Sequence, residues 1–502
     1  MENSDNKILT IDISSNNIKV GLVTENLELE NSSFHPYEII NEDIDGFAKS
    51  FDMTSIWKKI NSGIKEVLKR GKLERLLGIS SCGQRMAAIF LDKAGHEIYG
   101  GPNTDIRGID SAYLIEDHFS EEELFKITGH NPSVMFILAR LLWFQEERED
   151  KFKQISKILM LDDWIGYKLT GKCYSDYTSV GESQLFDVNK KIWSSEIINA
   201  FNFNNDLFPE IVNPGTVIGN LKSELIKEYG LKQTEIPVVK GCGDTQANLI
   251  GMGVIENGNI GITLGTTAPV HLVVNKPIFD TELNFWTECH IIDDKWLIEA
   301  NTGSAGRVYD WFKDAFLHSN LVNGNDLMDT YLHNSKPGAG STYAFLGPEF
   351  MTFKDMTSIK RGIFVFQPPS MIGEDLPKIQ NFARSCIENI CFGVLENVQA
   401  LYNFTDSTVK IFTSGGLTKS KEICTILTNI LNKELYVPVI KESAFIGCAM
   451  NVLVGLKLYS NYKTIVNELI NFEKHLANSS IAEDYNKIYT EWKNLKKKLD
   501  YL

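Results

Sequence analysis

The sequence predicts an α/β protein made of two related domains. Two segments, 8–23 and 258–274, share a pattern of alternating apolar residues interrupted by small residues. Between and after them, amphipathic helices alternate with short apolar strands, which is typical of an α/β architecture. A hairpin pattern that recurs about 250 residues later indicates a duplicated unit at the head of each domain. The boundary is expected near 250–257, which divides the chain into 1–252 and 253–502.

Each expected element follows from the spacing of its apolar residues. The first hairpin is interrupted by Ser14-Ser-Asn-Asn17 and the second by Gly265-Thr-Thr267, the pattern of strands joined by tight turns. Apolar residues at helical spacing predict helices over 56–68, 380–403 and 488–499. Short apolar runs predict strands at 77–81, 87–92, 236–240 and 409–413. The sheets are therefore expected to be covered by helices.

Composition narrows the class of protein. The 502 residues are 43% hydrophobic, enough for a large buried core. Sixty-five acidic and fifty basic residues give a net charge of −15, which argues against nucleic acid or an anionic membrane as a partner. Eight scattered cysteines without a CxxC pair indicate reduced thiols. With no apolar leader and no run of about 18 apolar residues, we expect a cytoplasmic protein that does not span a membrane.

Two aspartates stand at the ends of apolar strands among small residues. Asp12 follows Ile8-Leu-Thr-Ile11, and Asp244 follows Gly241-Cys-Gly243. Small residues let backbone N–H groups approach anionic oxygens closely. Mg²⁺ takes one or two carboxylates and keeps its remaining waters. The sequence therefore predicts that the chain handles a nucleotide together with magnesium.

Three segments carry groups that phosphates bind, namely hydroxyls, backbone amides and an ammonium. They are Ser14-Ser15 with Lys19, Leu264-Gly265-Thr266-Thr267, and Gly415-Gly416. The second segment offers donors of the kind a γ-phosphate needs. The third follows a strand and opens a helix, whose first amides favour anions. Each pattern alone also fits an ordinary turn, so their joint occurrence is what indicates a nucleotide site.

In this order and spacing, the motifs resemble the FGGY family of carbohydrate kinases, which belongs to the actin-like ATPase superfamily. The resemblance covers nearly the whole chain. Three further segments match the family pattern: Asn103-Thr-Asp105-Ile-Arg107, Leu169-Thr-Gly171 and Ala444-Phe-Ile-Gly447-Cys-Ala449. The resemblance implies two actin-like (ribonuclease H-like) domains with a central cleft, a sugar-binding domain at 1–252 and a nucleotide-binding domain at 253–502.

The resemblance also implies the reaction, which is ATP-dependent phosphorylation of a sugar or polyol hydroxyl. Asp244 matches the catalytic base, and Asp12 with Asp244 the Mg²⁺ site. The residues implied for ATP are Ser14, Ser15, Lys19, Gly265, Thr266, Thr267, Gly306, Asp310, Gly415, Gly416 and Ser420. Those implied for the substrate are Gln84, Arg85, Asp105, Arg107 and Gln246. The expected partner is a small-molecule sugar or polyol, and a homodimer is compatible with the sequence.

Several positions depart from the family pattern and bear on the substrate. Ser14 stands where the family has Gly, which removes a residue suited to unusual backbone angles. Met86 and Thr245 replace residues of glycerol kinases and disfavour glycerol. Asn103, at the position of a usual Trp, resembles autoinducer-2 kinases. We favour a kinase of a small open-chain pentulose or related ketose or polyol; an autoinducer-2-type kinase and a non-catalytic sugar or nucleotide sensor stay open.

Overall fold

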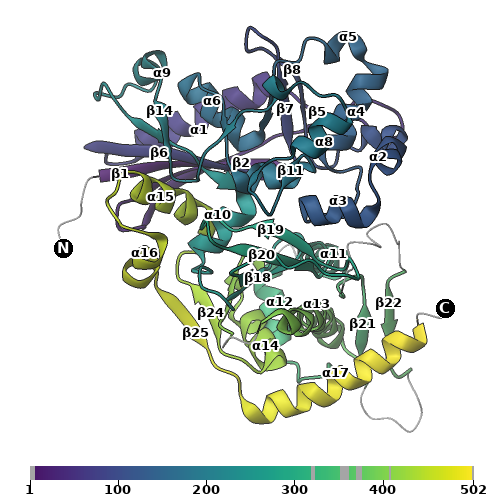
Figure 1. Ribbon diagram of the computed structural model, residues 1–502. Coiled ribbons are helices and arrows are strands. Elements are labelled where there is room, and N and C mark those ends of the chain that lie inside the picture. The colour runs from purple at the N-terminus through teal and green to yellow at the C-terminus, as the bar shows by residue number, and fades with distance from the viewer. Residues whose placement is uncertain (1–5, 318–322, 351–360, 369–375, 406–408, 500–502) are drawn as a thin grey trace.

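A computed structural model describes residues 6–317, 323–350, 361–368, 376–405 and 409–499. The chain forms two α/β halves, the N-terminal half above and the C-terminal half below in Figure 1. The predicted α/β class is confirmed. Within the described ranges, no helix combines the length and the apolar character that crossing a membrane requires.

Each half is built on a seven-stranded sheet, and the two sheets repeat one topology. The strand orders are β14-β15-β6-β1-β2-β3, with β16 also paired to β6, and β19-β20-β18-β17-β23-β24-β25. In both sheets the first two strands form an antiparallel hairpin, and the first strand also pairs in parallel with a later one, β1 with β6 and β17 with β23. The two hairpins predicted from the sequence therefore head sheets of the same design. The domain boundary at 252/253 stays a prediction.

The strands of the first sheet are β1 (Asn6–Ile13), β2 (Asn17–Thr24), β3 (Leu29–Pro36), β6 (Arg75–Gly83), β14 (Val217–Asn220), β15 (Pro237–Val239) and β16 (Cys242–Gly243). Those of the second are β17 (Ile260–Thr263), β18 (Pro269–Val274), β19 (Trp286–Cys289), β20 (Trp296–Asn301), β23 (Ile411–Ser414), β24 (Leu435–Pro438) and β25 (Phe472–His475). The shorter strands are β4 (Ile39–Asn41), β5 (Lys49–Phe51), β7 (Ala88–Leu91), β8 (Glu97–Gly101), β9 (Lys157–Met160), β10 (Tyr174–Ser175), β11 (Phe186–Asp187), β12 (Ile192–Trp193), β13 (Glu210–Ile211), β21 (Tyr343–Phe345) and β22 (Ile363–Val365).

Helices cover both sheets. In the N-terminal half they are α1 (Met53–Arg70), α2 (Tyr113–His118), α3 (Glu121–Thr128), α4 (Ile137–Glu147), α5 (Glu149–Phe152), α6 (Leu161–Thr170), α7 (Tyr177–Val180), α8 (Ser195–Ala200), α9 (Ser223–Glu228) and α10 (Asp244–Gly251). In the C-terminal half they are α11 (Ala305–Phe316), α12 (Gly324–His333), α13 (Ile379–Leu401), α14 (Lys421–Leu431), α15 (Ser443–Gly455), α16 (Tyr462–Leu469) and α17 (Ser479–Leu499). The three helices expected from apolar spacing are confirmed as α1, α13 and part of α17.

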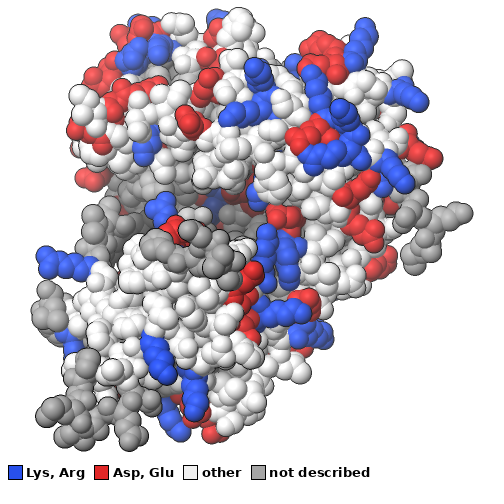
Figure 2. All heavy atoms as spheres, turned by 180° about the vertical axis from the view of Figure 1, so that it is seen from behind, with Lys and Arg blue, Asp and Glu red and all other residues white. Residues whose placement is uncertain are grey.

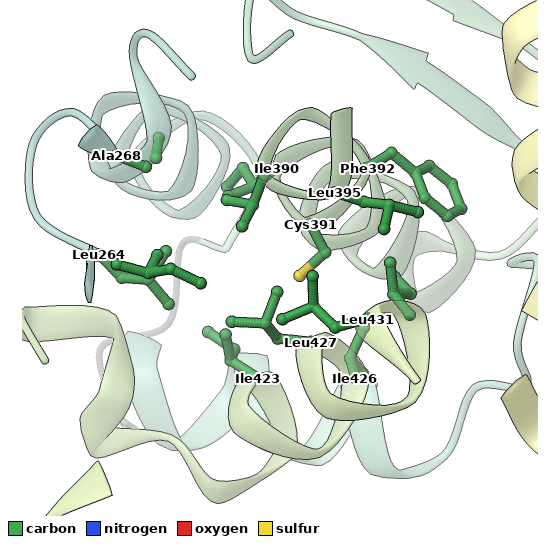
Figure 3. Packing of buried hydrophobic residues seen from close by; sticks show 14 of the residues in the cluster. Leu264, Ala268, Ile390, Cys391, Phe392, Leu395, Ile423, Ile426, Leu427 and Leu431 are labelled. Atoms are coloured by element: carbon green, nitrogen blue, oxygen red, sulfur yellow. The ribbon is translucent and has the colours of Figure 1, made fainter. Parts of the chain in front are cut away.

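The hydrophobic core of the C-terminal half anchors the turn that follows β17. Figure 3 shows Ile390, Cys391 and Leu395 of α13 facing Leu427 and its neighbours on α14. The side chain of Leu264, the residue directly after β17, lies in the same cluster and is 1% exposed. Burying an apolar side chain of this size stabilises its position by about 2 kcal/mol. The turn that begins at Gly265 is therefore anchored by a buried residue directly before it.

Two helices cross where the halves meet. In Figure 1, α15 comes from the C-terminal half but lies beside β1 and β6 of the first sheet. Gly447 of α15 packs on Ala247 of α10, and a Cβ at Gly447 would stand 2.0 Å from the Ala247 carbonyl oxygen. Only Gly allows this close approach. The crossing holds α10, which begins with Asp244, at the junction of the two sheets.

The face in Figure 2 carries acidic and basic side chains side by side over both halves. Such a mixed surface fits the net charge of −15 and does not resemble the basic track of a nucleic-acid-binding face.

Candidate functional site

A cavity of about 570 Å³ lies between the two halves and is lined by both of them. Twelve of the predicted site residues line it: Asp12, Ser14, Ser15, Lys19, Gln84, Arg85, Asp244, Gly265, Thr266, Thr267, Gly415 and Gly416. Its other lining residues are Phe34, Asn103, Thr245, Asn248, Thr263, Pro269, Lys419, Lys441, Glu442, Ser443 and Ala444. Segments more than 400 residues apart in the chain thus meet at one site.

Asp12 is held by the register of the first sheet. It pairs with Lys19 across the hairpin and with Cys82 on β6. The Lys19 ammonium lies 3.8 Å from its carboxylate, and the Cys82 thiol donates to it at 3.6 Å. Asp12 is 5% exposed, and burial raises its pKa although Lys19 opposes the shift. This carboxylate therefore has few protein donors of its own and suits a hard cation such as Mg²⁺.

Asp244 is the first residue of α10 and follows the short strand β16. Since Cys242 is in register with Cys82, which is itself in register with Asp12, both aspartates stand at the same end of the sheet. Two strand spacings separate their strands, about 10 Å. Burial raises the pKa of Asp244 to about 7; Arg85 lowers it and Asp12 adds to the increase. The Thr245 amide, which donates to the carboxylate at 2.8 Å, also favours its ionised form.

The turn after Asp12 tolerates Ser14 in place of a glycine. Ser14 does not have a positive φ. The Ser14 amide donates to the Asn17 carbonyl at 3.0 Å, and the Ser14 hydroxyl donates to the same oxygen at 3.2 Å. The Tyr37 hydroxyl donates to the Ser14 carbonyl at 2.7 Å. The turn is thus fixed by two hydrogen bonds of the Ser14 backbone, which any L-residue permits, and by one of its hydroxyl. Ser15 follows and is exposed to the cavity.

Two loops of the C-terminal half close on each other at the opposite wall. The Leu264 carbonyl accepts from the Leu417 amide at 3.2 Å, next to Gly415. Gly415 has φ +107°, and a Cβ there would stand 2.5 Å from the Leu264 oxygen, so the position requires glycine. Gly306, in the first turn of α11, donates its amide to the Gly265 carbonyl at 2.9 Å. The turn of Gly265, Thr266 and Thr267 is therefore supported from two sides.

Gln84 and Asn103 form a polar pair at the N-terminal wall. The Gln84 amide nitrogen donates to Asn103 Oδ1 at 2.6 Å and to Ser15 Oγ at 3.3 Å. Gln84 is 4% exposed, and its Oε1 has no hydrogen-bond partner among the residues that the structure describes. An unpartnered buried acceptor in a cavity wall is suited to a hydroxyl donor.

Asn248 joins the two halves at the cavity and was not identified from the sequence. From α10, its side chain donates to Thr263 Oγ1 at 2.8 Å and accepts from Ser414 Oγ at 3.1 Å. Thr263 and Ser414 are the last residues of two neighbouring strands of the second sheet. Lys441 and Glu442 were also missed. Glu442 accepts from Lys19 at 3.3 Å.

Asp105 and Arg107 do not line the cavity. The Arg107 guanidinium contacts the Asp105 carboxylate at 2.8 Å and Glu42 at 3.0 Å. Asp105 is fully buried and also accepts from the Tyr99 hydroxyl and, at 3.0 Å, from the Lys49 amide. These contacts use the groups that were predicted to bind a sugar. Their role in substrate binding stays a prediction that the cavity lining does not support.

Three further predicted residues are not part of the cavity lining. Gln246 is 1% exposed and donates to Glu288 and to the Cys289 carbonyl, each at 3.3 Å. Ser420 accepts from the Ile423 amide as the N-cap of α14 and donates to Asp329. Asp310 is exposed on α11 and pairs with Lys313 at 3.0 Å. Their contacts with a nucleotide or a substrate stay predictions.

Two family models match this chain. Residues 7–251 match the N-terminal domain of the FGGY family of carbohydrate kinases, and residues 260–456 match its C-terminal domain. The matched ranges follow the two sheet-bearing halves and include both walls of the cavity.

Relatives and solved structures are similar over nearly the full length. The protein YoaC of Bacillus subtilis (strain 168) is 27% identical, covering 86% of this chain and 85% of its own. An autoinducer-2 kinase of Salmonella paratyphi B is 24% identical, covering 88% and 85%. The structure of a xylulose kinase from Lactobacillus acidophilus has a TM-score of 0.85 at 18% identity, covering 99% and 98%. That of a gluconate kinase from the same organism has 0.84 at 19%, covering 98% of each. These structures have the fold of two actin-like, ribonuclease H-like domains, so the predicted fold is confirmed.

Proposed function

Because this chain belongs to the FGGY family of carbohydrate kinases and is an ATP-binding sugar kinase, we propose that it phosphorylates a hydroxyl of a small open-chain sugar, a pentulose or a related ketose or polyol. One observation carries this proposal. Carboxylates from the N-terminal half and the Gly, Ser and Thr loops of the C-terminal half line one cavity. Phosphoryl transfer needs a proton acceptor on one side of the site. On the other side it needs hydrogen-bond donors that position the phosphate.

Asp244 acts as the general base. Its ionised carboxylate accepts the proton of the substrate hydroxyl while that oxygen forms a bond to the γ-phosphorus and the bond from this phosphorus to ADP breaks. A pKa of about 7 suits this task, because the group is ionised to a large extent at neutral pH and is still basic enough to accept a proton. Arg85, which lowers this pKa, favours the ionised form.

Asp12 would hold the magnesium, with Asp244 as the second predicted ligand. The buried carboxylate of Asp12 lines the cavity, and among the described residues its ion-pair partner is Lys19, at 3.8 Å. Bound Mg²⁺ supplies positive charge that offsets the charge on the phosphate oxygens. Lys19 also pairs with Glu442, so the ammonium is fixed between the two halves.

The nucleotide is placed against the C-terminal wall. Gly265, Thr266 and Thr267 offer amides and hydroxyls to the transferring phosphate, and Ser14 with Ser15 offer hydroxyls from the facing turn. Gly415 and Gly416 lie at the start of a short helical turn (Gly416–Lys419), where backbone amides favour anions. Such positioning supplies most of the rate in phosphoryl transfer.

The substrate binds against Gln84, Asn103 and Asp244. The unpartnered Oε1 of Gln84 accepts from one hydroxyl and Asp244 from the hydroxyl that reacts. Neither interaction needs a charge on the substrate.

A second candidate substrate is a molecule of the autoinducer-2 type. Asn103 lines the cavity at a position where this chain resembles autoinducer-2 kinases, and a relative with that name is similar over most of the chain. Turnover of the autoinducer-2 precursor above that of every pentulose would assign this substrate.

The experiment is a coupled ADP-release assay over pentuloses, hexuloses, polyols, glycerol and the autoinducer-2 precursor. It compares wild type, Asp244→Asn and the control Asp484→Asn, whose carboxylate is 60% exposed on α17. We expect one neutral sugar to stimulate wild type and the control, and Asp244→Asn to lose about 10²- to 10⁴-fold in rate. No stimulation by any compound, with ATP still bound, would overturn the proposal.

A further inference from the structure

Arg85 lines the cavity and is held by acids of the other half. It follows β6 and Gln84, yet its guanidinium contacts Glu288 on β19 at 2.7 Å and Glu299 on β20 at 2.6 Å. A second nitrogen donates to the other Glu299 oxygen at 3.3 Å, which makes this pair bidentate. Glu182 of the N-terminal half lies at 3.6 Å. The side chains of the three acids are at most 1% exposed.

Other polar groups fix these acids in place. The Gln246 amide donates to Glu288 at 3.3 Å. His271 lies 3.3 Å from Glu299, and His130 lies 3.4 Å from Glu182. Burial opposes ionisation of Glu299, but Arg85 and His271 hold its pKa well below its usual range. Burial raises the pKa of Glu288 well above the usual range and favours its neutral form, although Arg85 opposes this shift. Glu299 thus carries the charge that matches Arg85.

The other cations of the cavity lie elsewhere. Among the described lining residues these are Lys19, Lys419 and Lys441. Lys19 follows the serine turn, Lys419 follows Gly415 and Gly416, and Lys441 precedes α15. Lys19 and Lys419 thus lie close in sequence to the proposed phosphate-binding groups, and none of the three lysines is adjacent in sequence to Gln84 or Asn103. In the part of this lining that Gln84 and Asn103 form, Arg85 is the one cation. Its guanidinium is already paired with Glu288 and Glu299.

We propose that Arg85 is a specificity-determining residue: Glu288 and Glu299 hold its guanidinium in a buried pair across the two halves, so the site accepts uncharged ketoses and polyols and rejects the corresponding sugar acids. This inference rests on the proposed function. A substrate carboxylate placed there would lose its water beside Asp244 and the acid cluster, without a free cation to compensate. A hydroxymethyl group or ketone at that position loses much less.

The test uses a matched set of five-carbon compounds, D-xylulose, xylitol and D-xylonate, and a six-carbon set, D-fructose, glucitol and gluconate. Binding is measured by calorimetry and turnover by ADP release. In wild type we expect each acid to bind at least about 10-fold more weakly than its neutral counterparts, the effect of one unmatched charge. An acid that binds as tightly as its polyol overturns the inference, whatever the variants do.

The variants address the mechanism. Glu299→Gln keeps the shape of the side chain but removes the negative charge that pairs with Arg85. The guanidinium can then pair with the carboxylate of D-xylonate, so we expect D-xylonate binding to tighten by at least about 10-fold. Arg85→Met in the Glu299→Gln background should abolish this gain. Glu256→Gln, which alters an exposed pair with Lys463, is the matched control and should show no gain. Where Glu299→Gln does not fold, Glu182→Gln, which replaces the acid 3.6 Å from Arg85 with an amide of the same shape, should also tighten D-xylonate binding, and a folded variant without any gain contradicts the role of Arg85.

The outcomes separate the two proposals. Stimulation of ADP release by an acid and not by its neutral counterpart contradicts the selectivity but leaves a kinase. A folded Glu299→Gln variant without any gain for D-xylonate contradicts the role of Arg85. No stimulation by any compound contradicts the proposed function, and the inference then fails with it.

Discussion

The two halves share one strand order but present different chemistry to the cavity. In the N-terminal half, carboxylates stand at the strand ends, Asp12 on β1 and Asp244 after β16. In the C-terminal half, the strands β17 and β23 end in Thr263 and Ser414 and lead into glycine turns. The repeated sheet therefore places the strand ends of both halves at the cavity. The residues at these ends differ: the N-terminal half supplies carboxylates, and the C-terminal half supplies hydrogen-bond donors for phosphate.

The largest effect is expected for the carboxylates that the N-terminal half presents to the cavity, Asp12 and Asp244. Asp12→Asn keeps the size of the side chain and removes its charge, so kcat should fall by about 10²- to 10³-fold, the loss typical of one electrostatic group. The Mg²⁺ concentration for half-maximal activity should rise as well. The measurement is kcat at a series of Mg²⁺ concentrations, with Asp484→Asn as control. An unchanged Mg²⁺ dependence would show that Asp12 does not hold the metal.

A smaller effect is expected for the loops of the other half. Gly415→Val places a branched side chain at φ +107° and a Cβ 2.5 Å from the Leu264 oxygen. The turn must shift, at a strain of about 1–3 kcal/mol, and KM for ATP should rise by about 10-fold.

The neighbouring glycine gives the matched comparison. A Cβ at Gly416 would meet no atom of the described residues within 4 Å, so Gly416→Ala should change KM for ATP much less than Gly415→Val. Equal effects of the two variants on KM would mean that the close approach to Leu264 does not shape the nucleotide site.

The smallest effect is expected where the halves are bridged. Asn248→Ala removes the hydrogen bonds to Thr263 and Ser414, and the free energy of unfolding should fall by about 1–2 kcal/mol. Denaturant unfolding measures this against Asn486→Ala, an exposed position on α17. Equal stability of the two variants would mean that the bridge does not couple the halves.

Sequence patterns predicted what local spacing determines. The two hairpins, both aspartates and the glycine turns were found because each is a strand end followed by small residues. Asn248 was missed because its partners lie on the other sheet and α10 shows no local sign of them. For the same reason the partners of Arg85, about 200 residues later in the chain, could not be predicted. Asp105 and Arg107 fit the family motif, but they bind each other.

The most direct test is the pH dependence of kcat/KM for wild type and Asp244→Asn with the sugar that stimulates turnover. Burial raises the pKa of Asp244, so the active, ionised form is lost as the pH falls through about 7. We predict that wild-type kcat/KM falls about 10-fold per pH unit below that value, and that Asp244→Asn is slow at every pH and lacks this break. A variant that keeps the rate and the break near pH 7 would contradict Asp244 as the base.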